Sequence, residues 1–271
     1  MPSPQIIAIL YTMHTEPIGV FDSGVGGLSI LREIKKLLPN ENYIFIADQK
    51  NVPYGGKTTG QLRKLSDRIV RKFLDSQVKL IVIACNTATC HAIDYLRRKH
   101  PLIPFVGTVP AIKIAAKLSK VKSIAVISTP ATSESSYLKK LIKDFASGIK
   151  VANIGCPNLE DTVEEGSLNS TKTKLLIKKY ISMAMSDNPD YIVLGCTHYP
   201  FLKKEIEKIS KVKTVDSGKA IARRVKFLLG DKLTKNKKPH TAYFTTGDSK
   251  KFSQVASTLL KTKIIAQKIR I

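Results

Sequence analysis

Short runs of apolar and β-branched residues alternate along this chain with longer amphipathic stretches. Such alternation predicts strand–helix units that build mostly parallel sheets, which is an α/β fold. The predicted strands form two sets of four, at 18–21, 43–47, 80–84 and 103–106, and at 123–127, 151–154, 191–194 and 212–215. Helices are expected between them, among others at 28–38, 61–76 and 171–185.

The two sets of strands correspond in order. The third run of each set is followed by a cysteine, Cys85 or Cys196, and the first run of each set ends in a hydroxyl-rich loop, at 22–24 or 128–130. We therefore predict two similar α/β domains, one formed by residues 1–110 with 222–271 and the other by 111–221. Residues 1–16 are expected to be an extension, and a last strand at 241–245 returns to the first domain. Because ligands bind at the carboxyl ends of parallel strands, the active site is expected in the cleft between the domains.

The chain is strongly basic. Its 271 residues, enough for two domains of roughly 150 residues each, include 45 Lys and Arg against 21 Asp and Glu, a formal net charge of +24. Such a surface favours anionic partners, including nucleic acid. The basic residues are dispersed, as on solvated helix faces, and only 235–238 forms a compact run. The sequence shows no helix-turn-helix, RNP or zinc-finger pattern, so a basic nucleic-acid-binding protein is retained only as an alternative.

Four cysteines, Cys85, Cys90, Cys156 and Cys196, show no CxxC pair, which argues against a zinc site or a redox dithiol. No secretory signal is visible in the sequence, and no stretch reaches about 18 uninterrupted apolar residues. We therefore predict a cytoplasmic protein with reduced thiols and no membrane partner. Cys90 and Cys156 are interpreted as structural.

Cys85 and Cys196 are the candidates for chemistry because they occupy matching places in matching halves. Each precedes a predicted helix N-terminus, where the macrodipole favours the thiolate and a modest downward pKa shift would make the thiol a base at neutral pH. His198 is expected to support Cys196. Asp22 is expected to do the same for Cys85 if the first and third strands are neighbours.

The glycine-rich loop at 22–28 follows a strand and opens a helix. Backbone N–H groups at such a start can bind a carboxylate or a phosphate. A dinucleotide fingerprint would need a third glycine where this chain has Ser29, so nucleotide binding is the weaker interpretation.

Four segments then carry a specific resemblance: 19–28, 52–55, 84–88 and 195–200, in this order. From Pro17 onward the chain resembles the glutamate racemases of the aspartate/glutamate racemase superfamily. Segments 156–157 and 163–166 are similar to the family as well. The segment 158–162 is more polar than the family's usual apolar stretch, and Gln49 stands where the family often has threonine.

The resemblance implies two similar α/β domains and a racemisation of L-glutamate to D-glutamate that needs no pyridoxal phosphate, metal or other cofactor. D-Glutamate serves peptidoglycan synthesis, and the family forms homodimers. Racemisation removes a proton from one face of a carbon and returns one to the other, which two flanking acid/base groups can do. The implied catalytic residues are Cys85, Cys196, Asp22, His198 and Glu164. The implied substrate-binding residues are Asp22, Ser23, Tyr54, Gly55, Asn86, Thr87, Thr132, Thr197 and His198. A racemase for another substrate, such as aspartate or a hydantoin, remains an alternative, although the segments 53–55 and 196–198 favour glutamate.

Overall fold

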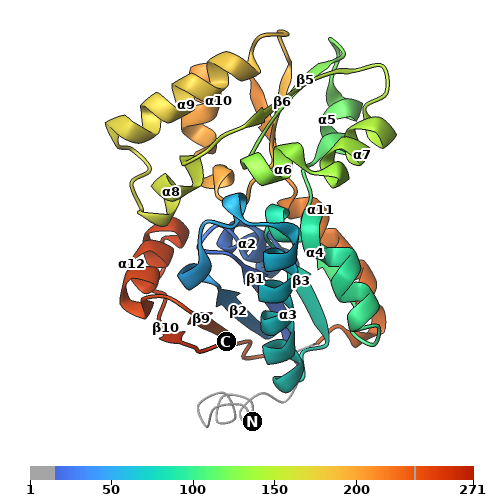
Figure 1. Cartoon of the computed structure of the whole chain (residues 1–271). Coiled ribbons are helices and arrows are strands. Elements are labelled where there is room, and N and C mark those ends of the chain that lie inside the picture. The colour runs from blue at the N-terminus through green and yellow to red at the C-terminus, as the bar shows by residue number, and fades with distance from the viewer. Residues whose placement is uncertain (1–15, 235) are drawn as a thin grey trace.

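A computed structural model describes residues 16–234 and 236–271, which form two α/β lobes (Figure 1). The predicted fold class is confirmed, since each lobe is built on a parallel sheet with helices packed against it. Most of the extension predicted at 1–16, and Lys235 of the basic run, lie outside the described residues. In the described part of the chain, no helix has the length and apolar character needed to cross a bilayer.

The first lobe contains a six-stranded sheet with the order β10-β9-β2-β1-β3-β4. Its strands are β1 (Ile18–Asp22), β2 (Tyr43–Ala47), β3 (Leu80–Ile83), β4 (Phe105–Gly107), β9 (Thr241–Thr245) and β10 (Ala266–Lys268). Every residue of β1, β2 and β3 is buried, as expected for parallel strands that are covered on both faces. β1 pairs with both β2 and β3, so the condition set for Asp22 and Cys85 is met.

The second lobe contains a four-stranded sheet with the order β6-β5-β7-β8. Its strands are β5 (Ser123–Ser128), β6 (Lys150–Gly155), β7 (Tyr191–Leu194) and β8 (Lys213–Val215). This order repeats the order β2-β1-β3-β4 of the first sheet, strand for strand. The predicted correspondence between the two sets of four strands is therefore confirmed by the topology.

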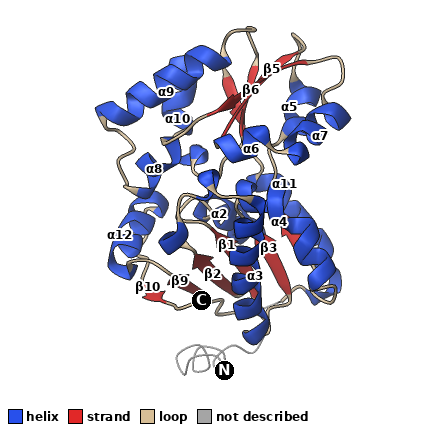
Figure 2. Cartoon of the chain, in the orientation of Figure 1, coloured by secondary structure: helices blue, strands red, loops and turns tan. Residues whose placement is uncertain are grey.

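Helices cover both sheets (Figure 2). They are α2 (Leu28–Leu37), α3 (Thr59–Asp75), α4 (Asn86–Lys99), α5 (Ile112–Leu118), α6 (Pro130–Glu134), α7 (Ser136–Phe145), α8 (Leu159–Glu164), α9 (Thr171–Ala184), α10 (Lys203–Ser210), α11 (Gly218–Leu229) and α12 (Ser249–Leu260). The three helices named from the sequence end within two residues of the predicted limits. A capping box between Thr58 and Gln61 fixes the start of α3.

The chain returns to the first lobe after β8, where α11 packs against α2 and β9 pairs with β2. The domain boundaries stay predictions, and the one at 221/222 falls within α11. The strand expected to be last, β9, is followed by β10, which pairs with it in parallel. β10 has the sequence Ala-Gln-Lys, which lacks the apolar alternation that identifies a strand, so pairing with the sheet edge decides its conformation.

Candidate active site

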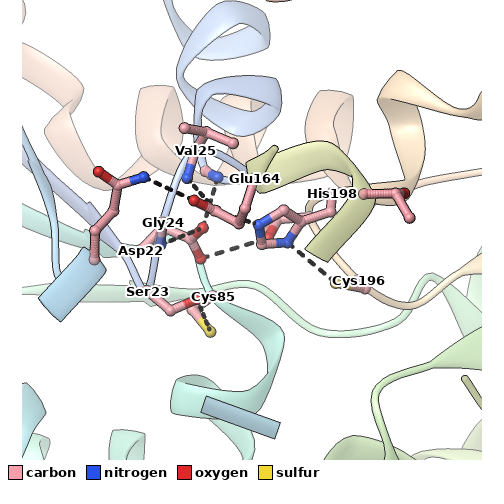
Figure 3. Close-up of polar contacts among 12 residues, drawn as sticks. Asp22, Ser23, Gly24, Val25, Cys85, Glu164, Cys196 and His198 are labelled. Atoms are coloured by element: carbon pink, nitrogen blue, oxygen red, sulfur yellow. Dashed lines mark hydrogen bonds and ion pairs between the residues drawn. The ribbon is translucent and has the colours of Figure 1, made fainter. Parts of the chain in front are cut away.

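Cys85 follows the carboxyl end of β3 and is the N-cap residue of α4. The backbone N–H of Ala88 donates a hydrogen bond to Sγ of Cys85 at 3.4 Å, and the thiol lies 3.9 Å from Oγ of Ser23 (Figure 3). The predicted helix N-terminus at this cysteine is confirmed. The first helical turn therefore holds the sulfur in a defined position.

Cys196 follows the carboxyl end of β7, the counterpart of β3. The prediction of an α-helix start is wrong here, because only a short 3₁₀ helix, Tyr199–Phe201, follows within the loop. Pro200 occupies the first turn of this short helix. The sulfur lies 3.4 Å from Nδ1 of His198, and the backbone N–H of His198 also interacts with it.

The two thiols line one cavity between the lobes, as predicted. The residues that surround it are Ser23, Val52, Pro53, Tyr54, Gly55, Cys85, Asn86, Thr87, Thr129, Glu160, Cys196, Thr197 and His198. Its volume of about 20 Å³ corresponds to roughly one water molecule. This volume is smaller than that of an amino acid.

His198 lies between Cys196 and Glu164 (Figure 3). Its Nε2 is 2.7 Å from Oε1 of Glu164, which also accepts the backbone N–H of Val25 at 2.6 Å. The other oxygen of Glu164 accepts from Nε2 of Gln49 at 2.7 Å. Glu164 does not line the cavity, so it acts on the site by holding the imidazole and by joining α8 to the first lobe.

Burial alone would raise the pKa of Glu164 and lower that of His198, but the neighbouring side chains reverse both directions. The hydrogen bond and the charge of His198 lower the pKa of Glu164. Cys196 and Glu164 hold the pKa of His198 well above its usual range. An ionised Glu164 accepts a hydrogen bond from the N–H at Nε2 of His198, which leaves Nδ1 to share a proton with the sulfur of Cys196.

Asp22 is the last residue of β1 and is fully buried, but it is not among the residues that line the cavity. It accepts hydrogen bonds from the backbone N–H groups of Gly24 and Gly27 and, at 3.4 Å, from the hydroxyl of Thr197. Burial raises the pKa of Asp22 despite the nearby charge of His198 and these hydrogen bonds. The carboxyl group therefore links the two lobes through Thr197, beside the Ser23 that contacts Cys85.

Hydroxyl and amide groups complete the site. Oγ1 of Thr87 lies 2.9 Å from that of Thr129 and 3.1 Å from that of Thr132, so the predicted Thr132 supports the cavity wall from behind. Oδ1 of Asn86 is buried and has no hydrogen-bond partner among the described residues. Tyr54 donates a hydrogen bond to Asp48 at 2.6 Å, which fixes the wall on the other side.

Comparison with known proteins shows the family to which the chain belongs. Residues 18–225 match the family model described as Asp/Glu/Hydantoin racemase. A glutamate racemase of Herpetosiphon aurantiacus is 41% identical over 254 residues, which cover 91% of this chain and 99% of that protein. The chain belongs to the glutamate racemase family.

Solved structures of the family agree with the fold of this racemase. A glutamate racemase isoform from Bacillus anthracis superimposes with a TM-score of 0.87 at 30% identity, covering 94% of this chain and 98% of that one. The glutamate racemase of Francisella tularensis, solved in complex with D-glutamate, gives a TM-score of 0.84 at 31% identity and covers 96% and 98% of the two chains.

The approach of the second lobe leaves little room for a side chain at two glycines of the racemase's first loop. A Cβ atom at Gly24 would lie 1.8 Å from Oε1 of Glu164, and one at Gly26 would lie 2.5 Å from Nδ1 of His198. The sequence suggested a tight turn or an anion-binding loop. The close approach of Glu164 and His198 is the constraint that the structure adds.

The expected lowering of the thiol pKa is wrong for the structure as it stands. Burial raises the pKa of Cys85 well above its ordinary value, and the charge of Asp22 adds to this effect. Burial also raises the pKa of Cys196, although His198 opposes it. The backbone N–H and the imidazole act in the predicted direction, but removal of water from the closed cavity outweighs them.

Sequence reasoning missed Thr129 and Glu160, which line the cavity, and the contact of Gln49 with Glu164. Thr129 lies in the loop that matches 22–24, so the internal repeat could have indicated it. Glu160 lies in the segment that departs from the family by its polarity. Within 16–234 and 236–271, no group of three or more His, Cys, Asp or Glu side chains is placed to hold a metal ion.

Proposed function

We propose that this racemase interconverts L- and D-glutamate by a two-base reaction of Cys85 and Cys196. The observation that carries the proposal is that both thiols line one cavity, each at the end of the equivalent strand of its own sheet. One cysteine enters as a thiolate and takes the α-proton. The other enters as a thiol and gives its proton to the opposite face of the same carbon, so the two protonation states are exchanged in each turnover.

Charge builds up on the α-carbon and its carboxylate during this exchange, and fixed hydrogen-bond donors stabilise it. Asn86, Thr87 and Thr197 line the cavity next to the cysteines and are assigned this role. Glu164 and His198 support Cys196. Ser23 contacts the thiol of Cys85, whereas the charge of Asp22 adds to the burial that raises the pKa of this thiol and so favours its protonated form. The two thiols thus have different partners although their strands are equivalent.

Glutamate is proposed as the substrate because relatives at this level of similarity are glutamate racemases and one was solved with D-glutamate. Tyr54 and Gly55 line the cavity and are assigned to substrate binding, and Thr132 supports the part of the wall formed by Thr87 and Thr129. The proposal includes a role in supplying D-glutamate for peptidoglycan in the cytoplasm, without a bound cofactor, and a homodimeric assembly.

The test is a racemisation assay by circular dichroism with the full chain, L-glutamate and no added cofactor. We expect the optical signal to decay to zero, because the two enantiomers are equally stable in water. L-Aspartate is run in parallel. A signal that decays with aspartate and stays constant with glutamate would favour the alternative substrate and overturn the proposal.

A further inference from the structure

Glu160 places a buried carboxyl group in the wall of the cavity. It lies in the first turn of α8, is 7% exposed, and lines the same cavity as Cys85 and Cys196. Its Oε2 is buried without a hydrogen-bond partner among the described residues. Burying a carboxyl oxygen without a hydrogen-bond partner costs free energy. Either a ligand that bonds to this atom or protonation of the carboxyl group would lower this cost.

The neighbours of Glu160 place it on one side of the cavity. A Cβ atom built on Gly55 would lie 3.3 Å from Oε1 of Glu160 and 3.3 Å from Cβ of Thr129. Glu160, Gly55 and Thr129 therefore form one patch of the wall. Asn86 and Thr197, next to the two cysteines in sequence, are assigned to the groups on the α-carbon, which leaves this patch for the side chain of the substrate.

The charges around Glu160 decide its protonation state. Burial is the largest influence and raises the pKa of Glu160, and the acids Asp161 and Glu164 on the same helix add to it. A hydrogen bond from the backbone N–H of Glu160 itself and the charge of His198 oppose this rise without reversing it. The other titratable groups that interact with Glu160 become negatively charged when they ionise, so none of them would stabilise an ionised Glu160. They are Cys156, Cys196, Tyr180 and Tyr199. The residues that line the cavity include His198 as a cation and neither Lys nor Arg.

An ionised Glu160 would repel a dicarboxylate, whereas a neutral one carries a proton to donate. We propose that Glu160 binds substrate in its neutral form and donates a hydrogen bond from Oε2 to the side-chain carboxylate of glutamate. This inference rests on the proposed function. It gives the polar segment 158–162 a role in recognition: the cavity binds an acidic side chain with a neutral acid in place of a cation.

Two substitutions of Glu160 distinguish the role of its donated proton from that of a negative charge. Glu160→Gln keeps a donor of the same shape, and Glu160→Leu removes it. We expect KM for glutamate to stay within about twofold in Glu160→Gln at neutral pH and to rise about tenfold or more in Glu160→Leu, since a hydrogen bond to a charged group is worth that factor. Glu165→Gln is the matched control, because Glu165 follows the same helix but is exposed. Thermal unfolding of each variant checks that the fold is retained.

The pH dependence is the second readout. Above the raised pKa of Glu160 the proton is lost, so KM of the unsubstituted racemase should increase with pH. Gln does not titrate, so KM of Glu160→Gln should lack this increase and the two profiles should diverge at high pH. If Glu160 instead accepts the substrate ammonium as a carboxylate, Gln raises KM at every pH, which overturns the inference. Parallel profiles with equal KM in all variants overturn it too. Absence of glutamate turnover in the unsubstituted chain, by contrast, contradicts the proposed function itself.

Discussion

Nε2 of His198 lies 2.7 Å from Oε1 of Glu164, although 34 positions separate the two residues in the chain. This contact turns Nδ1 of the imidazole toward Cys196, at 3.4 Å from its sulfur. The Cys85 thiol has no such relay and contacts Ser23 and the start of α4 instead. The two thiols therefore lie in different surroundings, although each follows the equivalent strand of its own sheet.

Replacement of either cavity thiol should nearly abolish racemisation. Cys85→Ser and Cys196→Ser each remove one of two acid/base groups, and a positioned acid or base contributes a factor of about 100 to 10,000. Cys90→Ser should stay close to full activity, because Cys90 does not line the cavity and burial raises the pKa of its thiol to about 11. Initial rates by circular dichroism measure all three. Full activity in either of the first two variants would contradict the two-thiol reaction.

Solvent hydrogen should appear at the α-carbon. The thiol that gives its proton exchanges with water between turnovers, so L-glutamate racemised in deuterated water should yield D-glutamate that carries deuterium. Proton NMR of the α-hydrogen signal measures this gain. Product that retains the original hydrogen would mean that the proton returns from the same group, and the two-base route would be wrong.

Removing the charge of Glu164 should weaken the support of Cys196. Glu164→Gln keeps the shape but leaves His198 without its ionised partner, so the pKa of the imidazole should fall. We expect kcat/KM to drop about tenfold or more, the value of a charge-assisted hydrogen bond. Because the enantiomers have an equilibrium constant of one, kcat/KM must drop by the same factor in both directions. Unchanged kinetics, equal to those of the exposed control Glu165→Gln, would show that the contact has no part in the reaction.

A methyl group in the first loop should disturb the site. Gly26→Ala places a Cβ atom 2.5 Å from Nδ1 of His198 and 2.6 Å from Oγ1 of Thr197, so the imidazole must move. Overpacking of this kind costs about 1–3 kcal/mol of stability, and activity should fall strongly. Gly56→Ala is the matched control, since nothing lies within 4 Å of its Cβ position. Similar loss in both variants would point to a general effect of the loops rather than to contact with His198.

A buried ion pair outside the site should govern stability rather than catalysis. Nζ of Lys79 lies 2.6 Å from Oε2 of Glu41, and both side chains are at most 5% exposed. Lys79→Met leaves the buried Glu41 charge unpaired and should lower the free energy of unfolding by about 3–5 kcal/mol. Lys36→Met, which breaks the exposed pair with Glu33, should change it by less than about 0.5 kcal/mol. Urea denaturation measures both, and Lys79→Met combined with Glu41→Leu should recover much of the loss.

Much of the fold follows from local pattern. Apolar runs of strand length mark the two sets of four strands, and the sequence around the third run of each set places a thiol at its carboxyl end. The strand β10 was not predicted from the sequence, because three residues at a sheet edge take their conformation from the strand with which they pair. The α-helix start expected at Cys196 failed because the loop there forms only a short 3₁₀ helix before α10 begins.

The sequence by itself determined the α/β class, the internal repeat and the pair Cys85 and Cys196. Only the tertiary structure decided what surrounds these thiols. Glu164 contacts His198, the imidazole packs closely against Gly26, and Glu160 lines the cavity. All three contacts arise because the two lobes, which are far apart in sequence, pack against each other. The same packing sets the sign of the thiol pKa shifts. A helix N-terminus is a local feature that can be read from sequence, but desolvation depends on every residue that closes the cavity.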